Sequence, residues 1–75
     1  MKDKQLIFVN INGLIETFYV DNLKLIENLK KGVYEAKEEV AKIVDSHYEG
    51  KWDSYKVITD DEIVVVHHKF DRARN

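Results

Sequence analysis

Alternating apolar and polar positions at the start of the chain predict a β-hairpin over residues 5–20. The dipeptide Asn12-Gly13 separates two such alternating runs. It is the strongest short hairpin signal, because a type I′ turn needs a positive φ at both central positions. A two-residue loop then pairs Ile11 with Leu14 and sets the register of the whole ladder.

Both faces of this hairpin carry large apolar side chains. Because the side-chain period of a strand is two, Ile7, Val9 and Phe18 share one face, which is the more apolar face and the predicted core side. Another four large residues point to the opposite face: Leu6, Phe8, Ile15 and Tyr19. One helix covers only one face of a small sheet, so this second face is the main clue to function.

A long amphipathic helix is predicted over residues 21–48, with Asp21 as its N-cap. Apolar residues repeat at spacings of three and four from Ile26 to His47, which is the period of one buried stripe. Gly32 allows an alternative, since a glycine here can instead end a first short helix. The stripe keeps its phase across this glycine, so we predict one helix, roughly 40 Å long. Such a helix overhangs the strands, which favours a second subunit.

The third segment, residues 52–70, reads as a second hairpin that turns at Asp60-Asp61. Adjacent aspartates specify a turn less strictly than Asn-Gly does, so this register is less certain than the first. A two-residue loop pairs Val57 with Val64 on the core side. The second strand is apolar on both faces, which leaves its face assignment open.

Together these elements predict a single small domain spanning residues 1–75 and ending in a frayed tail, 71–75. The fold class is α+β with the order ββαββ: a four-stranded, mainly antiparallel sheet with one long helix packed on one face. We expect the helix stripe to pack on Ile7, Val9, Phe18, Val57 and Val64. A chain of 75 residues buries only about 60% of its unfolded surface, and without cysteine, oligomerisation is the common way to enlarge its core.

Composition excludes several classes of protein. Hydrophobic residues make up 44% of the chain and charged residues 35%, which is a globular balance, and the net charge of −2 gives no electrostatic footprint for nucleic acid. No apolar run approaches the roughly 20 residues of a membrane span. We therefore expect a cytoplasmic protein with no membrane partner. Lysine far outnumbers arginine, a usage similar to that of low-GC bacteria and their phages.

Residues that carry chemistry do not form a motif in this sequence. His67 and His68 are adjacent in a strand and so point to opposite faces, and His47 adds only one more ligand where zinc needs three or four. The acidic turn 60–62 lacks the ligand spacing of a calcium loop. No nucleophile elbow or phosphate-binding glycine loop is present. We predict no catalytic, cofactor-binding or metal-binding residues, no cofactor and no enzymatic activity.

The leftover sheet face is the predicted binding site, because large apolar patches on small proteins usually mark an interface. The residues assigned to it are Leu6, Phe8, Ile15, Tyr19, Trp52, Ile58, Ile63 and Val65. We expect this face to close a homodimer and to bind an unidentified protein. By analogy of size and composition alone, the chain is interpreted as a phage or mobile-element accessory protein that inhibits a host factor.

A single-stranded nucleic-acid binder is the alternative function. Phe8 and Tyr19 lie on one predicted sheet face, where aromatic rings can stack on bases, and the chain ends are basic at Lys2, Lys4, Arg72 and Arg74. The acidic turn 60–62 opposes phosphate binding, so nucleic acid is not the expected partner.

Overall fold

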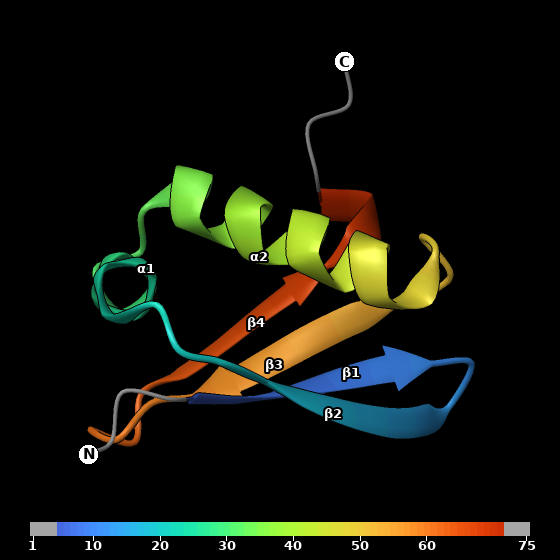
Figure 1. Cartoon of the computed structure of the whole chain (residues 1–75), viewed down its shortest axis with the longest axis horizontal. Helices are drawn as coiled ribbons and strands as arrows, with labels where there is room; N and C mark the ends of the chain where they lie inside the picture. The colour runs from blue at the N-terminus through green and yellow to red at the C-terminus, as the bar shows by residue number, and fades with distance from the viewer. Residues whose placement is uncertain (1–4, 72–75) are drawn as a thin grey trace.

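The computed structural model describes residues 5–71 and shows one sheet with two helices on one side (Figure 1). In chain order the elements are β1 (Gln5–Ile11), β2 (Leu14–Val20), α1 (Leu23–Lys30), α2 (Tyr34–Tyr48), β3 (Ser54–Ile58), β4 (Val64–His68) and the 3₁₀ turn η1 (Lys69–Asp71). The strand order is β2-β1-β3-β4, and each neighbouring pair is antiparallel. The predicted α+β class with a four-stranded antiparallel sheet is therefore confirmed.

The first hairpin has the register predicted from its turn. Ile11 pairs with Leu14, and the ladder continues without a bulge to the pair Gln5 and Val20. Asn12 has φ +53° and Gly13 has φ +87°, as a type I′ turn requires. A two-residue loop with this chemistry thus sets which side chains face the helices.

The helical region is two helices and not one, which corrects the prediction of a continuous helix over 21–48. Gly32 adopts φ +79°, a left-handed conformation that glycine tolerates best. The Gly32 N–H donates to the Leu29 carbonyl at 3.0 Å, and the Val33 N–H donates to the Asn28 carbonyl at 3.1 Å. These two bonds form a Schellman motif, which satisfies carbonyls at the end of α1 and turns the chain.

The caps of the two helices also differ from the prediction. Asn22, and not Asp21, is the N-cap of α1, and its side-chain oxygen accepts a hydrogen bond from the Leu25 N–H at 3.1 Å. The second helix, α2, has 15 residues and is about 22 Å long, which matches the length of the strands beneath it. The expected overhang, which had favoured a second subunit, is therefore absent.

The second hairpin is shifted by one residue from its predicted register. Val57 pairs with Val65 and Ile58 with Val64, because the loop comprises residues 59–63 and not two aspartates alone. The Thr59 N–H donates to the Ile63 carbonyl at 3.0 Å, which closes this wider loop. A shift of one residue exchanges the two faces of a strand, so every side chain of β4 lies opposite to its predicted side.

This wider loop is tied to α1 by Lys30. Its ammonium group lies 2.9 Å from the Asp61 carboxylate and 3.2 Å from the Asp60 carboxylate. The hydrogen bond to Asp61, followed by that to Asp60, raises the pKa of Lys30 above its usual value. The predicted frayed tail, 71–75, begins at the last residue of η1, and residues 72–75 lie outside the described part of the chain.

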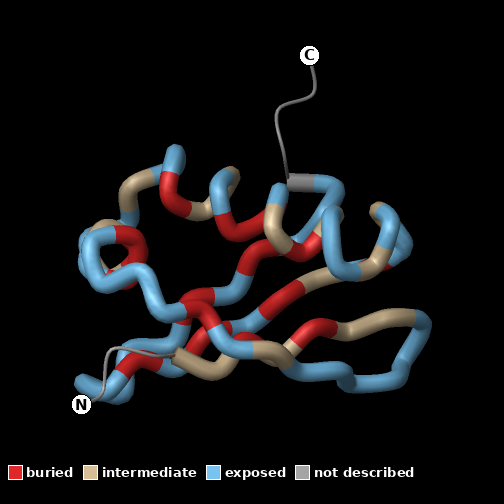
Figure 2. Tube along the Cα trace, viewed as in Figure 1, coloured by how far each residue is buried: buried red, intermediate tan, exposed pale blue. Residues whose placement is uncertain are grey.

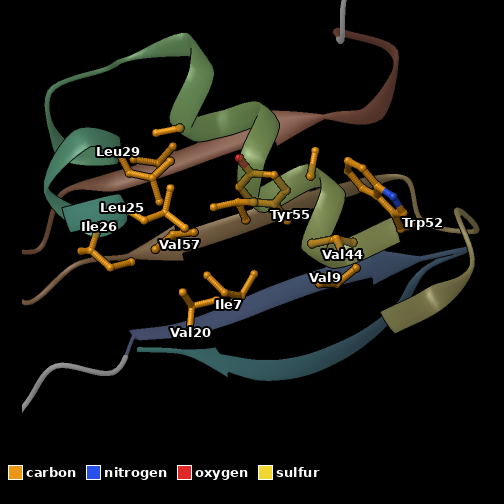
Figure 3. Close-up of a cluster of buried hydrophobic side chains, with 14 residues drawn as sticks. Ile7, Val9, Val20, Leu25, Ile26, Leu29, Val44, Trp52, Tyr55 and Val57 are labelled. Carbon is orange, nitrogen blue, oxygen red and sulfur yellow. The ribbon is translucent and has the colours of Figure 1, made fainter. Parts of the chain in front are cut away.

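The hydrophobic core lies between the sheet and both helices (Figure 3), and Figure 2 shows the buried positions lining that gap. It comprises Ile7, Val9, Val20, Leu25, Ile26, Leu29, Ala36, Val40, Ala41, Val44, Trp52, Tyr55, Val57 and Val65. Of the predicted sheet contacts, Phe18 packs at the border of this core, whereas Val64 is 55% exposed and Val65 takes its place. The Tyr55 hydroxyl donates to the Lys37 carbonyl at 2.9 Å, so this buried polar group is satisfied.

Candidate protein-binding surface

The face of the sheet that points away from α1 and α2 is the candidate functional site, and we call it the outer face. It is formed by alternate residues of the four strands: Leu6, Phe8, Asn10, Ile15, Thr17, Tyr19, Ser54, Lys56, Ile58, Val64, Val66 and His68. Both helices lie on the opposite side of the sheet (Figure 1). Within residues 5–71, no other segment forms a layer over the outer face.

Strand pairing arranges these side chains in three rows that run across the sheet. From β2 to β4, the first row holds Tyr19, Leu6, Ile58 and Val64, the second holds Thr17, Phe8, Lys56 and Val66, and the third holds Ile15, Asn10, Ser54 and His68. The first row is apolar throughout, the second is mixed and the third is mainly polar. The outer face therefore has an apolar end and a polar end.

The apolar end contains a shallow hollow of about 420 Å³. Its lining comes from three strands and one loop: Gln5, Leu6, Phe8, Tyr19, Ile58, Thr59 and Asp60. Tyr19 is 66% exposed and Ile58 is 40% exposed, so apolar surface remains in contact with water here. A hollow of this size accommodates one large apolar side chain from another molecule.

Among the outward-pointing residues of the four described strands, Lys56 is the one lysine, arginine or carboxylate. It is exposed and lies between Phe8 on β1 and Val66 on β4 in the second row. No outward-pointing position of the four described strands carries a carboxylate. Any partner that covers the centre of this face must therefore supply a counter-charge or leave a desolvated ammonium group.

The structure brings together five of the eight residues assigned to this surface from the sequence. Leu6, Phe8, Ile15, Tyr19 and Ile58 all lie on the outer face. A sixth, Ile63, lies in the loop before β4 and is 40% exposed, but the strand pairing does not place it on the outer face.

Two assigned residues, Trp52 and Val65, are instead in the core. Val65 is 8% exposed because the shifted register turns it toward the helices. Trp52 lies before β3 and is 2% exposed, with its indole N–H donating to the Asp45 carboxylate at 2.6 Å. This bond satisfies the only polar atom of the tryptophan side chain and connects it to α2.

Seven residues of the outer face are not in the set predicted from the sequence, and three of them give this face its charge and part of its apolar surface: Lys56, Val64 and Val66. The two valines replace Val65 once the five-residue loop is taken into account. The signal available in the sequence was the uninterrupted apolar run in β4, which left its face assignment open. Only the loop geometry around Thr59 resolves that ambiguity.

The three histidines lie apart from one another. His67 faces the core and is 3% exposed, whereas His68 faces outward, so the two adjacent histidines point to opposite faces as predicted. His67 Nε2 is 3.7 Å from the Glu38 carboxylate on α2. His47 stacks on Phe18 with ring centroids 4.4 Å apart. Across residues 5–71, no three His, Asp or Glu side chains gather in a way that would hold a metal ion.

A wider hollow of about 780 Å³ lies at the opposite end of the molecule, beside the β1–β2 turn. Its polar groups hold the local chain together. The Asn12 N–H donates to the Asp53 carboxylate at 2.8 Å, and the Lys69 ammonium group donates to the Gly50 carbonyl. These contacts attach the turn and η1 to the loop before β3. The polar residues that line this hollow therefore have a structural role that needs no ligand to explain it.

Comparison of the chain with protein-family models, curated proteins and solved structures found no match. Neither helix in the described part of the chain has the length and apolar composition needed to cross a bilayer.

Proposed function

We propose that this chain is a non-enzymatic protein-interaction module whose outer face binds a partner through an apolar side chain and a neighbouring carboxylate. The observation that carries the proposal is the apolar row beside Lys56 on a sheet face that neither helix covers. Contiguous exposed apolar surface on a small protein usually marks an interface. Tyrosine is a frequent binding anchor on such surfaces.

The spacing of the two features limits the partner's sequence. Lys56 and Ile58 are two residues apart on β3 and point to the same side, so their Cα atoms are separated by about 7 Å. An extended partner segment spans this distance with residues i and i+2. A partner helix presents side chains at a similar spacing from residues i and i+3 or i+4. We therefore expect a large apolar residue for the hollow and an aspartate or glutamate at one of these spacings.

Self-association through the outer faces is the second use predicted for this surface, and Lys56 counts against it. Two copies packed face to face would bury two ammonium groups, and the described strands offer no carboxylate on that side. Desolvation of an unpaired charge costs several kcal/mol. A heterologous partner with an acidic residue avoids this cost, so the proposal commits to that partner.

Single-stranded nucleic acid is the rival occupant, because Phe8, Tyr19 and Lys56 share the outer face. Aromatic rings next to a lysine are the usual elements of a stacking platform. The four basic terminal residues that supported this reading from the sequence, Lys2, Lys4, Arg72 and Arg74, lie outside the described residues. The acidic loop around Asp60 borders the apolar end and repels phosphate, so the protein partner is preferred.

A random peptide library displayed on phage provides a defined probe for the proposal. Immobilised wild-type chain is expected to enrich peptides with an acidic residue two positions, or three to four positions, from a large apolar residue. A Lys56→Glu bait should lose those peptides and favour basic ones instead. Lys24→Glu, an exposed charge reversal on α1, is the matched control and should retain the wild-type peptides. Enrichment that is unchanged by Lys56→Glu would reject the proposed contact.

Amide chemical shifts then locate the binding surface. Adding an enriched peptide to isotopically labelled protein should shift the amide resonances of residues in the three rows of the outer face. The amide resonances of exposed α2 residues should not shift. Shifts centred on α2, or tight binding of oligothymidylate in place of any peptide, would overturn the proposal. Inhibition of a host factor stays a prediction, to be examined once a peptide motif points to a partner.

A further inference from the structure

The strand β2 forms an open edge of the sheet along its whole length. It pairs with β1 on one side, and within residues 5–71 no strand pairs with it on the other. Six of its seven residues are not buried, and Figure 2 shows β2 exposed along most of its path. Edge strands are usually protected by proline, lysine, a bulge or a covering segment. The sequence of β2, LIETFYV, contains neither proline nor lysine, and its ladder has no bulge.

The turn fixes which backbone groups point to this open edge. In a two-residue hairpin, the residues that flank the turn exchange both hydrogen bonds, and alternate pairs along the ladder then do the same. Ile11 with Leu14 is such a pair, so the even-numbered residues of β2 bond to β1. The N–H and C=O groups of Ile15, Thr17 and Tyr19 therefore point outward, away from the sheet.

We propose that two copies of this chain pair through their β2 edges, antiparallel and about a two-fold axis at Thr17, to form one eight-stranded sheet. In this register Thr17 pairs with Thr17 of the second copy, and Ile15 pairs with its Tyr19. The outward N–H and C=O groups of all three residues then meet their counterparts. A two-fold interface uses the same patch on both subunits, as this self-complementary arrangement requires.

The side chains on the outer side of the paired edges also match. Ile15 is 59% exposed and Tyr19 is 66% exposed in the single chain. The two-fold axis places each beside the other in the neighbouring copy, as an aromatic and β-branched cross-strand pair. Thr17 meets its own copy, and threonine pairs are likewise favourable across antiparallel strands.

On the inner side of the paired edges, which faces the helices, a second set of side chains comes together. Leu14, which is 69% exposed, comes to lie opposite Val20 at the border of the partner core. Glu16 comes to lie opposite Phe18, which is stacked on His47 in each copy at 4.4 Å. The two Glu16 residues then lie diagonally across the axis and not directly opposite each other, which is the arrangement that destabilises like charges most.

The opposite edge, β4, is less suited to the same pairing. It has five residues and not seven, and it passes directly into the 3₁₀ turn η1. Its burial alternates, so two of its five side chains are already committed to the core. The longer and more exposed strand is therefore assigned as the self-pairing edge.

Pairing through β2 leaves the outer face open in each copy and places two such faces in one continuous sheet. A partner that carries the recognised segment twice would therefore be bound bivalently, which raises avidity without any new contact. The pairing itself depends on β2 alone and does not rest on the proposed function of the outer face.

Disulfide crosslinking tests the register, because the chain contains no cysteine. In Thr17→Cys the two Cα atoms across the axis are expected about 5.5 Å apart, within the range that a disulfide spans. Mild oxidation should form covalent dimer roughly tenfold faster, or more, than in Ile15→Cys, where the equivalent atoms lie about 14 Å apart. Faster crosslinking of Lys56→Cys would indicate face-to-face packing, and that of Val66→Cys would indicate pairing through β4. Either result would overturn the proposal.

A proline at the axis tests whether the edge itself is required. Because the Thr17 N–H points away from β1, Thr17→Pro removes no bond of the hairpin, and edge strands tolerate proline at such positions. Light scattering should show a dimer for the wild-type chain and a monomer for Thr17→Pro, with unchanged circular dichroism. Tyr19→Lys, which keeps every backbone group, should weaken the dimer at least severalfold and covers the case in which the proline variant fails to fold. A wild-type chain that is monomeric at every concentration, or a Tyr19→Lys variant that dimerises normally, would reject β2 pairing.

Discussion

Replacing Gly32 with alanine tests the break between α1 and α2 directly. Gly32 has φ +79°, and a Cβ added there would have no heavy atom within 4 Å. Steric collision with the rest of the fold is therefore absent, and the cost arises from the left-handed backbone alone. That conformation costs an L-residue roughly 1–2 kcal/mol. Alanine also restricts the conformations of the unfolded chain, which stabilises the folded state by about 0.4–1 kcal/mol. We therefore expect a net decrease of about 1 kcal/mol in the free energy of unfolding.

Urea and thermal unfolding, both monitored by circular dichroism, measure this loss. For a domain of this size, 1 kcal/mol corresponds to a decrease of roughly 4–8 °C in Tm, well above the error of the method. D-alanine, introduced at position 32 by chemical synthesis, is the matched control. It adds the same methyl group but prefers a positive φ, so it should stabilise the chain by several tenths of a kcal/mol.

The opposite order of stabilities would show that the helix continues through Gly32. In a continuous helix, alanine removes the penalty of an interior glycine and stabilises by up to about 1 kcal/mol, whereas D-alanine destabilises. Asparagine tolerates the left-handed region better than alanine does. Gly32→Asn should therefore lie between the wild-type protein and Gly32→Ala in stability if the Schellman motif is correct.

Four other outcomes follow from the fold. Ile7→Asp should unfold the chain, because it buries an unpaired charge. Phe8→Asp lies on the outer face and should keep a native circular dichroism spectrum. The reverse result would show that the two faces of the sheet are assigned the wrong way round. Leu29→Ala should cost about 2–5 kcal/mol in urea unfolding, since this side chain is 1% exposed in the core. Fluorescence anisotropy should detect no binding to single- or double-stranded oligonucleotides tighter than about 10⁻⁴ M at physiological salt. The contribution of Lys30 and Tyr48 to the free energy of unfolding should be constant below about pH 10 and decrease above it in an alkaline titration. The folded state raises the pKa of both groups, that of Tyr48 mainly by burial, and so binds these protons more tightly than the unfolded chain does.

The first hairpin is the part of the fold that short-range sequence specifies most completely. Asn12-Gly13 permits one turn type with one loop length, so seven cross-strand pairs follow from two residues. The second hairpin lacks such a signal. Thr59 closes a five-residue loop with its backbone and hydroxyl groups, and Glu62 adopts φ +65° within it, a conformation that glutamate seldom takes. Nothing in an Asp-Asp-Glu sequence specifies that loop.

The candidate site could likewise be predicted only on the strands whose register the sequence specifies. Its members on β1 and β2 were found from alternation alone, because their register was fixed by the turn. Its members on β4 were displaced by one residue, and Trp52 was assigned to the surface because the sequence cannot reveal its hydrogen bond to Asp45. Lys56 was overlooked because a single lysine has no meaning until its neighbours are known to be Phe8 and Val66.

Three features of this protein could be predicted from its amino-acid sequence alone: the fold class, the first hairpin and the existence of a sheet face that the helices cannot cover. Each of these depends on short-range physics: turn geometry, side-chain alternation and the helical period of apolar residues. The tertiary structure decided the break at Gly32, the register of β4 and the order β2-β1-β3-β4. At Gly32 the apolar stripe permits both one helix and two. Packing two shorter helices over strands of five to seven residues buries both apolar stripes, which one helix of twice the length would not achieve.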